Sequence, residues 1–234
     1  MAVVIVAIPW LFMSLLVGAA ACVPLYGGNL RRFLRSSLFV KVVMWIPLFV
    51  VFVAAVAGGF TTGLLLGVGL ASVGAVEWFR RDRARRTWWY LALFAASCAA
   101  WPISTANLAP ALWMTYCLSS VFSDVMAFFF GRYLGRHRLP DWINRGKSWE
   151  GVFGQLIGGV LGVLHLGMIF GTEPPLLAGL VIGAASAAGD LVNSVAKRIV
   201  GVEDWGSTIP GHGGVIDRFC SLNVALTAAV LLPR

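Results

Sequence analysis

Long apolar runs dominate this sequence and leave few folds open to it. A helix that crosses a lipid bilayer needs about 20 mostly apolar residues. Eight such runs follow one another with short connections: residues 3–26, 39–56, 60–79, 88–103, 111–130, 152–170, 175–196 and 216–232. The sequence therefore predicts an all-α protein, a polytopic transmembrane helical bundle of about eight spans with short loops. The spans use the whole chain, so residues 1–234 form a single transmembrane domain.

The composition excludes the main soluble classes. Hydrophobic residues make up 59% of the 234 residues and charged residues only 12%, whereas a soluble domain carries about 25% charged residues. A cytosolic enzyme, a secreted disulfide scaffold and a disordered chain are all inconsistent with these values. The four cysteines are scattered without a CxxC pair, so we interpret them as packing residues.

The basic residues indicate how the chain is oriented. All of the 18 Lys and Arg residues except Arg234 lie in or beside the connections after the first, third, fifth and seventh runs. Cytoplasmic loops of membrane proteins are enriched in Lys and Arg. We therefore expect these four connections to face the cytoplasm and both termini to face outward, as in a protein of a bacterial inner membrane. The net charge of +8 then reflects topology, and no nucleic acid partner is expected.

Small residues recur at helical spacing in two of the runs. Gly154, Gly158 and Gly162 are spaced by four residues, as are Gly63 and Gly67. Glycines at this spacing let helix backbones approach closely in a membrane. We interpret both sets as helix-packing positions and not as ligand sites.

Three acidic residues stand out within the apolar runs. Asp124 lies in run 111–130, Asp190 in run 175–196, and Asp217 at the start of run 216–232. A carboxylate at the membrane centre costs on the order of 2.5–3.5 kcal/mol, so such residues are functional candidates by default. The structural alternative is a buried ion pair or an acid at a helix end that reaches the interface.

Asp190 belongs to a polar row along one helix. Asp190, Ser194 and Lys197 are spaced i, i+4 and i+7, so they share one helix face. A carboxylate, a hydroxyl and an ammonium group in this order suit a metal-bound phosphate, because the acid can hold the cation and the other two can hold phosphate oxygens.

A glycine-rich segment precedes the last run. Residues 210–214 read Pro-Gly-His-Gly-Gly, and Asp217 follows in the first turn of the next helix. Gly213 and Gly214 could leave backbone N–H groups facing an anion at the helix N-terminus, with His212 beside them. Asp217 would lie within reach of the same site as a second metal ligand.

A second polar segment lies between runs 111–130 and 152–170. It contains several Arg residues and the stretch Lys147-Ser148-Trp149-Glu150-Gly151. Basic residues beside an interface suit a phosphate tail. The alternative is cytoplasmic topology together with binding to anionic lipid headgroups. That alternative explains Arg80–Arg86 well, but it does not explain an acid and an aromatic residue built into 147–151.

The stretch from Ser194 through Lys197-Arg198, Asp204 and residues 210–218 resembles the signature of phosphatidate cytidylyltransferases, also called CDP-diacylglycerol synthases. Residues 124–151 are similar to a second conserved stretch of that family, so the resemblance covers roughly the C-terminal half. It implies a polytopic membrane enzyme that joins CTP and phosphatidic acid into CDP-diacylglycerol, releases pyrophosphate and needs Mg²⁺, with a second cation implicated. It leaves open whether the chain acts as a homodimer.

The resemblance also implies residue roles. The expected catalytic residues are Asp190, Asp217, Lys197, Arg198 and His212, with Asp190 and Asp217 holding Mg²⁺. The expected substrate-binding residues are Asp124, Lys147, Ser194, Gly213, Gly214 and Arg218. Residues 111–234 would then form the catalytic half, and residues 1–110 a lipid-facing scaffold.

The chain departs from the family pattern at several positions. Glu203 replaces a lysine, Cys220 replaces an acid, and Phe128 replaces a tyrosine. A thiol is a poor ligand for Mg²⁺ or a monovalent cation, so we expect a weak second-cation site and a divergent paralogue. Two other functions stay open: a transporter or lipid-handling protein that uses Asp124 and Asp190 for protons or Na⁺, and a catalytically weak paralogue that only binds its ligands.

Overall fold

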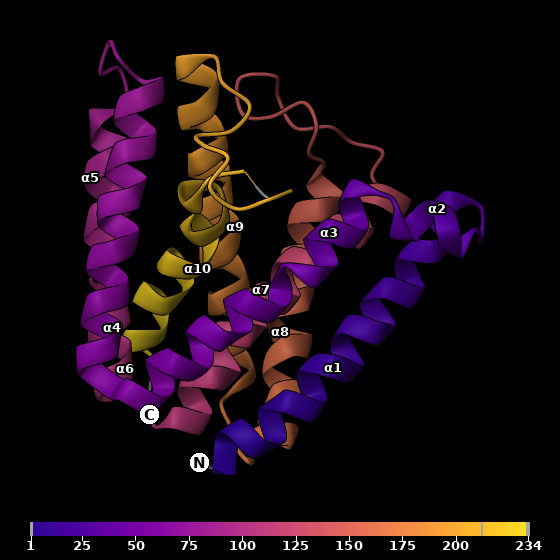
Figure 1. The fold of residues 1–234 in the computed structure, drawn as a ribbon, viewed down its shortest axis with the longest axis vertical. Helices are drawn as coiled ribbons and strands as arrows, with labels where there is room; N and C mark the ends of the chain where they lie inside the picture. Colours follow the sequence, from indigo (N-terminus) through magenta and orange to yellow (C-terminus); the bar gives the residue numbers. More distant parts are fainter. Residues whose placement is uncertain (1, 212, 233–234) are drawn as a thin grey trace.

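A computed structural model describes residues 2–211 and 213–232 of the chain, and this part is helical (Figure 1). The helices are α1 (Ala2–Cys22), η1 (Val23–Tyr26), α2 (Leu30–Leu34), α3 (Ser37–Val43), α4 (Trp45–Arg81), α5 (Trp88–Ser97), α6 (Ala100–Asn107), α7 (Pro110–Tyr133), α8 (Trp149–Phe170), α9 (Leu176–Val200) and α10 (Val215–Val230). Apart from the helices, the described residues form two isolated β-bridges. The predicted all-α class is confirmed.

Among the described residues, five helical stretches are long and apolar enough to cross a membrane. They are Ile5–Tyr26, Leu38–Arg81, Pro110–Tyr133, Trp149–Phe170 and Leu176–Val200. Each lies over one or two of the predicted apolar runs. The predicted runs 88–103 and 216–232 correspond to shorter helices, α5 with α6 and α10, which fall below that length.

The second stretch is bent at a single glycine. Gly59 has φ 57° and ψ −139°, which lies outside the helical region and suits a residue without a side chain. It falls in the gap between the predicted runs 39–56 and 60–79. Figure 1 shows the result: one arm of α4 crosses the molecule obliquely, and the other stands upright beside α5.

The predicted run 88–103 is broken into α5 and α6 at Cys98 and Ala99. Pro102 explains the position of the break. A proline has no N–H to donate to the carbonyl four residues earlier, but it is tolerated in the first turn of a new helix. Because α6 begins at Ala100, Pro102 lies in that first turn.

Glycines allow the helices that carry the polar residues to pack closely. A Cβ atom added to Gly158 would lie 2.8 Å from the Cα atom of Ser123 on α7, and one added to Gly162 would lie 2.9 Å from the Cα atom of Ser119. On α4, a Cβ atom at Gly63 would lie 2.9 Å from the carbonyl oxygen of Trp101 on α6. The packing role predicted for these glycines is confirmed.

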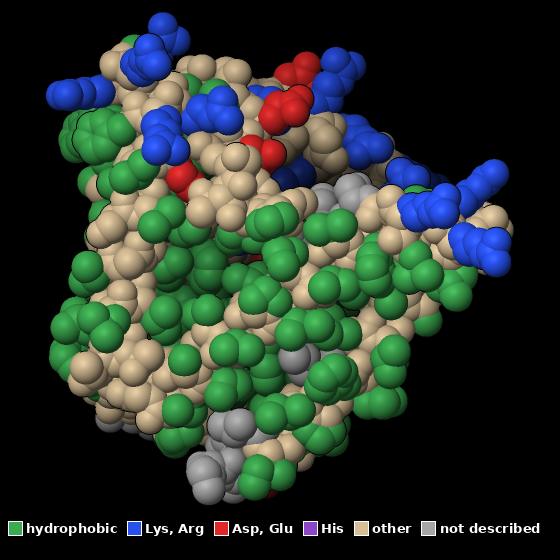
Figure 2. Space-filling view, viewed as in Figure 1, with side chains coloured by type: hydrophobic (Ala, Val, Ile, Leu, Met, Phe, Trp, Pro, Cys, Tyr) green, Lys and Arg blue, Asp and Glu red, His purple; other side chains and the backbone are tan. Residues whose placement is uncertain are grey.

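The basic connections gather at one end of the bundle. Figure 2 shows Lys and Arg side chains along one rim of the molecule, with a mainly apolar surface below them. The α4–α5, α7–α8 and α9–α10 connections all lie at this end, and the start of α1 and the end of α10 lie near the opposite end (Figure 1). We call the rim carrying these three connections the basic end.

Candidate active site

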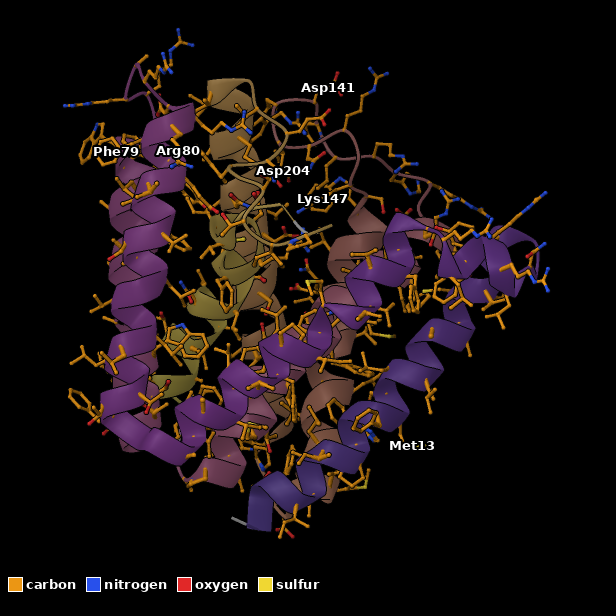
Figure 3. All side chains as sticks on the ribbon, viewed as in Figure 1. Met13, Phe79, Arg80, Asp141, Lys147 and Asp204 are labelled. Atoms are coloured by element: carbon orange, nitrogen blue, oxygen red, sulfur yellow. The ribbon has the colours of Figure 1, made fainter. Side chains whose placement is uncertain are left out.

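The polar row of α9 meets two other segments at the basic end. Lys147, from the α7–α8 connection, forms an ion pair with Asp190 and also donates to its backbone carbonyl oxygen, with 3.4 Å between the nitrogen and the oxygen. Lys197 Nζ lies 2.8 Å from Asp217 Oδ1 on α10 and 3.8 Å from Asp204 Oδ1 in the α9–α10 connection. Figure 3 shows Lys147 and Asp204 at the basic end, well away from Met13 on α1. The structure therefore joins the three segments through two acid–lysine pairs.

Asp217 is the more deeply buried of the two acids. Its side chain is 1% exposed, whereas that of Asp190 is 33% exposed. Asp217 Oδ2 accepts hydrogen bonds from the backbone N–H groups of Trp205 at 2.8 Å and Gly214 at 3.0 Å. Since a carboxylate offers about four acceptor sites, Asp217 has three engaged by protein groups. It organises the α9–α10 connection, and Asp190 is the more open of the two carboxylates.

Asp124 lies in the same polar cluster on a third helix. Its two carboxylate oxygens accept hydrogen bonds from Gln155 Nε2 on α8 at 3.0 Å and Ser221 Oγ on α10 at 2.8 Å. It also interacts electrostatically with Asp190 and Lys147. Asp124 thus links α7, α8 and α10 beside the first acid–lysine pair.

The α7–α8 connection is built to hold Lys147 in place. Ser148 Oγ accepts a hydrogen bond from the Gly151 backbone N–H at 3.1 Å and so caps α8. Glu150 accepts one from His137 Nδ1 at 2.6 Å, and a β-bridge joins Arg138 to Ser148. The acid in 147–151 therefore ties the connection together, which membrane topology alone does not explain.

The glycines of residues 210–214 make room for carboxylates. Gly213 has φ +84°, and a Cβ atom there would lie 3.0 Å from the Asp204 carboxylate and 3.1 Å from Asp217 Oδ2. The N–H groups at the start of α10, expected to face an external anion, donate instead to acids of the chain: Gly214 to Asp217, and Val215 and Ile216 to Glu77.

The remaining predicted residues differ in their placement. Ser194 is buried on α9 between Asp190 and Lys197. Arg198 is exposed on the last turn of α9, and Arg218 is exposed in the first turn of α10. His212 lies outside the described residues.

Glu77 is the residue that sequence reasoning missed. It lies near the end of α4, is 5% exposed, and accepts hydrogen bonds from Thr208 Oγ1 and from the N–H groups of Val215 at 2.9 Å and Ile216 at 3.2 Å. A signal was present, because Glu77 is the only acid in the predicted run 60–79. Its partners, 131 to 139 residues away, could not be read from the sequence.

The donor set of the site fits a magnesium ion that is bound together with a phosphate ligand. Within residues 2–211 and 213–232, no group of three or more His, Cys, Asp and Glu side chains is arranged to hold a metal. Mg²⁺, however, is usually bound through one or two carboxylates together with water and substrate phosphates, and not by a protein cage. The partly exposed Asp190 is a carboxylate of this kind. Asp217 keeps one acceptor site but is 1% exposed and paired with Lys197, so it could add a ligand only if Lys197 moved away.

A family model identifies the kind of protein to which the chain belongs. The model of the "Cytidylyltransferase family" matches residues 1–233. The chain belongs to this family.

Three curated relatives show how far the similarity to individual proteins extends. Uncharacterized protein YnbB of Escherichia coli is 36% identical over 68% of this chain and 56% of its own length. The phosphatidate cytidylyltransferase of Synechocystis is 45% identical over 41% of this chain and 34% of its own length. That of Haemophilus influenzae is 38% identical over 44% of this chain and 39% of its own length. This cytidylyltransferase-family chain thus spans about half or less of the length of these relatives.

Proposed function

We propose that the protein transfers a cytidylyl group from CTP to a lipid phosphate such as phosphatidic acid. A phosphate oxygen of the lipid attacks the α-phosphorus of CTP and forms a new P–O bond. The bond from the α-phosphorus to the oxygen that bridges to the β-phosphorus breaks, so that CDP-diacylglycerol and pyrophosphate result. The observation that carries this proposal is the meeting of the Lys147–Asp190 and Lys197–Asp217 pairs at the basic end of a member of the cytidylyltransferase family.

The charge of each side chain suggests which part of the substrates or which ion it would hold. Asp190 and Asp217 would hold a divalent cation, for which we propose Mg²⁺, and the cation would neutralise phosphate charge when bound. Lys197, Arg198 and His212 would hold the nucleotide phosphates and the leaving pyrophosphate. Such transfers depend mainly on positioning and charge stabilisation. The proposed substrate-binding residues are Asp124, Lys147, Ser194, Gly213, Gly214 and Arg218. Among them Gly214 would act by shaping the turn, because its N–H donates to Asp217.

Both lysines would have to change partners when substrates bind. In this structure Lys147 and Lys197 neutralise the carboxylates that the cation would occupy. With Asp190 and Asp217 holding a cation, the Lys147 and Lys197 ammonium groups would be free to hold the phosphates that arrive with it. Cys220 is buried beside the site and adds no oxygen ligand, so we propose that a second, monovalent cation is bound weakly or not at all.

A radiochemical assay tests the proposed function. The purified full chain in mixed micelles would receive CTP labelled on its α-phosphate, phosphatidic acid and Mg²⁺. We expect a labelled lipid that depends on all three additions. Absence of labelled lipid, together with flux of protons or Na⁺ in liposomes, would favour the transporter. CTP binding without turnover would favour the weak paralogue.

We also propose that the chain crosses a bacterial inner membrane eight times. The Leu38–Arg81 stretch has 44 residues, roughly 66 Å at 1.5 Å per residue, which is about twice the hydrocarbon thickness. With its bend at Gly59 it supplies two crossings. The α5–α6 pair and α10 supply two more, and the basic end faces the cytoplasm. Residues 111–234 would form the catalytic half and residues 1–110 mainly a scaffold.

Cysteine labelling checks this topology. Ser207 is exposed in the α9–α10 connection, and Glu173 is exposed in the α8–α9 connection at the opposite end. In a variant without native cysteines, we expect a membrane-impermeant maleimide to label Glu173→Cys from outside in intact cells, and Ser207→Cys only after permeabilisation. Labelling of both positions in intact cells would contradict the proposed topology.

A further inference from the structure

Glu77 connects the N-terminal half of the chain to the start of α10. Its carboxylate lies where a bound anion would be expected, at the N-terminus of a helix, because the partial positive charge there favours an anion. Two of the first N–H groups of α10 and the hydroxyl of Thr208 all donate to it. The Glu77 carboxylate therefore takes the place of a bound anion at the start of α10.

The surrounding loop packs closely against the Glu77 carboxylate. A Cβ atom added to Gly206 would lie 2.6 Å from Glu77 Oε1, and one added to Gly214 would lie 2.7 Å from Glu77 Cδ. The α9–α10 connection thus wraps the carboxylate closely from two sides. Gly214 also donates to Asp217, so adjacent residues of one turn are held by the two acids.

The end of α4 that carries Glu77 is itself fixed. Trp78 Nε1 donates to Thr87 Oγ1 at 2.8 Å, and the Thr87 N–H and hydroxyl both donate to Asp82 Oδ2 at 2.7 Å. Burial alone would raise the pKa of Asp82, but the hydrogen bonds from Thr87 and Arg86 outweigh burial and lower it. Asp82 therefore stays ionised and closes the turn after α4, which leaves Glu77 on a rigid support.

The other side of the connection is held by an aromatic contact. Trp205 Nε1 and the Tyr90 hydroxyl both donate to Asn193 Oδ1 at 2.8 Å, and the two rings stack with centroids 5.6 Å apart. The Trp205 N–H then donates to Asp217. The position of Asp217 is thus set from one side by Trp205 and from the other by the turn that Glu77 holds.

We propose that Glu77 is a positioning residue, which acts through the start of α10 to place Asp217 for cytidylyl transfer. The scaffold half then supplies one part of the site, although Glu77 need not touch the substrate. The effect on turnover rests on the proposed function, whereas the effect on the loop does not.

Glu77→Gln tests the proposal, because the amide keeps the size but loses the charge and turns one acceptor into a donor that faces other donors. In hydrogen exchange of the full chain in detergent, we expect protection of residues 213–219 to fall about tenfold to a hundredfold. The turnover number should fall about tenfold or more, while KM for CTP changes by less than about threefold. Glu203→Gln, an exposed acid of the same connection, is the matched control and should leave both readouts unchanged.

Gly206→Ala provides a second variant that keeps the charge. Its new methyl group should displace the Glu77 carboxylate and change both readouts in the same direction, so the test survives if Glu77→Gln does not fold. Unchanged protection in either variant would overturn the proposal. So would a turnover loss that merely follows the loss of folded protein. If the wild type lacks cytidylyl transfer but protection still falls, the proposed function fails while the loop-holding role of Glu77 stands.

Discussion

Asp190→Asn is expected to lower turnover about 100-fold or more while leaving the fold intact. The substitution keeps the size of the side chain but removes the charge that would hold a divalent cation, and losses of this order follow removal of one group that stabilises a transition state. Asp190 has Lys147 as its charged partner and is one-third exposed, so the cost to stability should be small. Turnover and the thermal midpoint in detergent are the two measurements.

Asp217→Asn should behave differently in the second measurement. It should lower turnover by a similar factor, but it should also lower the thermal midpoint. An amide cannot accept all three hydrogen bonds that Asp217 receives from Lys197, Trp205 and Gly214 without bringing its own NH₂ group against a donor.

Asp141→Asn is the matched control for both substitutions, because its ion pair with Arg145 is exposed and 3.7 Å long. It should match the wild type in turnover and in thermal midpoint. Wild-type turnover in Asp190→Asn or Asp217→Asn would remove that residue from the proposed site. Equal thermal midpoints for the two variants would contradict the inference that Asp217 organises the α9–α10 connection.

Lys197→Met should have the largest effect on stability among substitutions at the site. Lys197 is 14% exposed and pairs with a carboxylate that is 1% exposed. Removing one partner of a buried ion pair costs about 3–5 kcal/mol, because the other charge stays buried without compensation. The connection that Asp217 organises should loosen, and turnover should become undetectable.

The measurements for Lys197→Met are denaturation in detergent and the labelled-lipid assay. Arg145→Met is its control, since that residue loses only an exposed ion pair. Lys197→Arg keeps the charge and should recover much of the stability, although a guanidinium group cannot reproduce the position of an ammonium group. Full stability of Lys197→Met would show that the Lys197–Asp217 pair contributes little to holding the connection.

The helical class and most helix positions follow from local sequence. An apolar run long enough to cross a bilayer predicts a helix from its length alone. The reason is that the backbone must satisfy its own hydrogen bonds in lipid. The i, i+4, i+7 spacing placed Asp190 and Lys197 on one face of α9, and the structure engages both in ion pairs. The spacing of Gly158 and Gly162 likewise predicted the close packing that they make with α7.

Helix boundaries were less predictable where one residue decides them. The bend of α4 depends on Gly59, which has a positive φ. The two predicted runs on either side of it therefore form one bent helix. The break before α6 depends on Pro102, which cannot continue the hydrogen bonds of α5. Both residues were visible in the sequence, but glycine and proline also occur inside unbroken membrane helices.

The sequence by itself determined that this chain is a bundle of apolar helices and which acids and lysines could carry its chemistry, because both depend on residue type and spacing along the chain. Only the tertiary structure decided the partners: Lys147 with Asp190, and Glu77 with the start of α10. These contacts join residues 43 to 139 positions apart, and periodicity carries no information at such separations. The structure also decided that the first N–H groups of α10 donate to the protein's own carboxylates. A buried N–H group has no water to pair with, so it must donate to an acceptor of the protein.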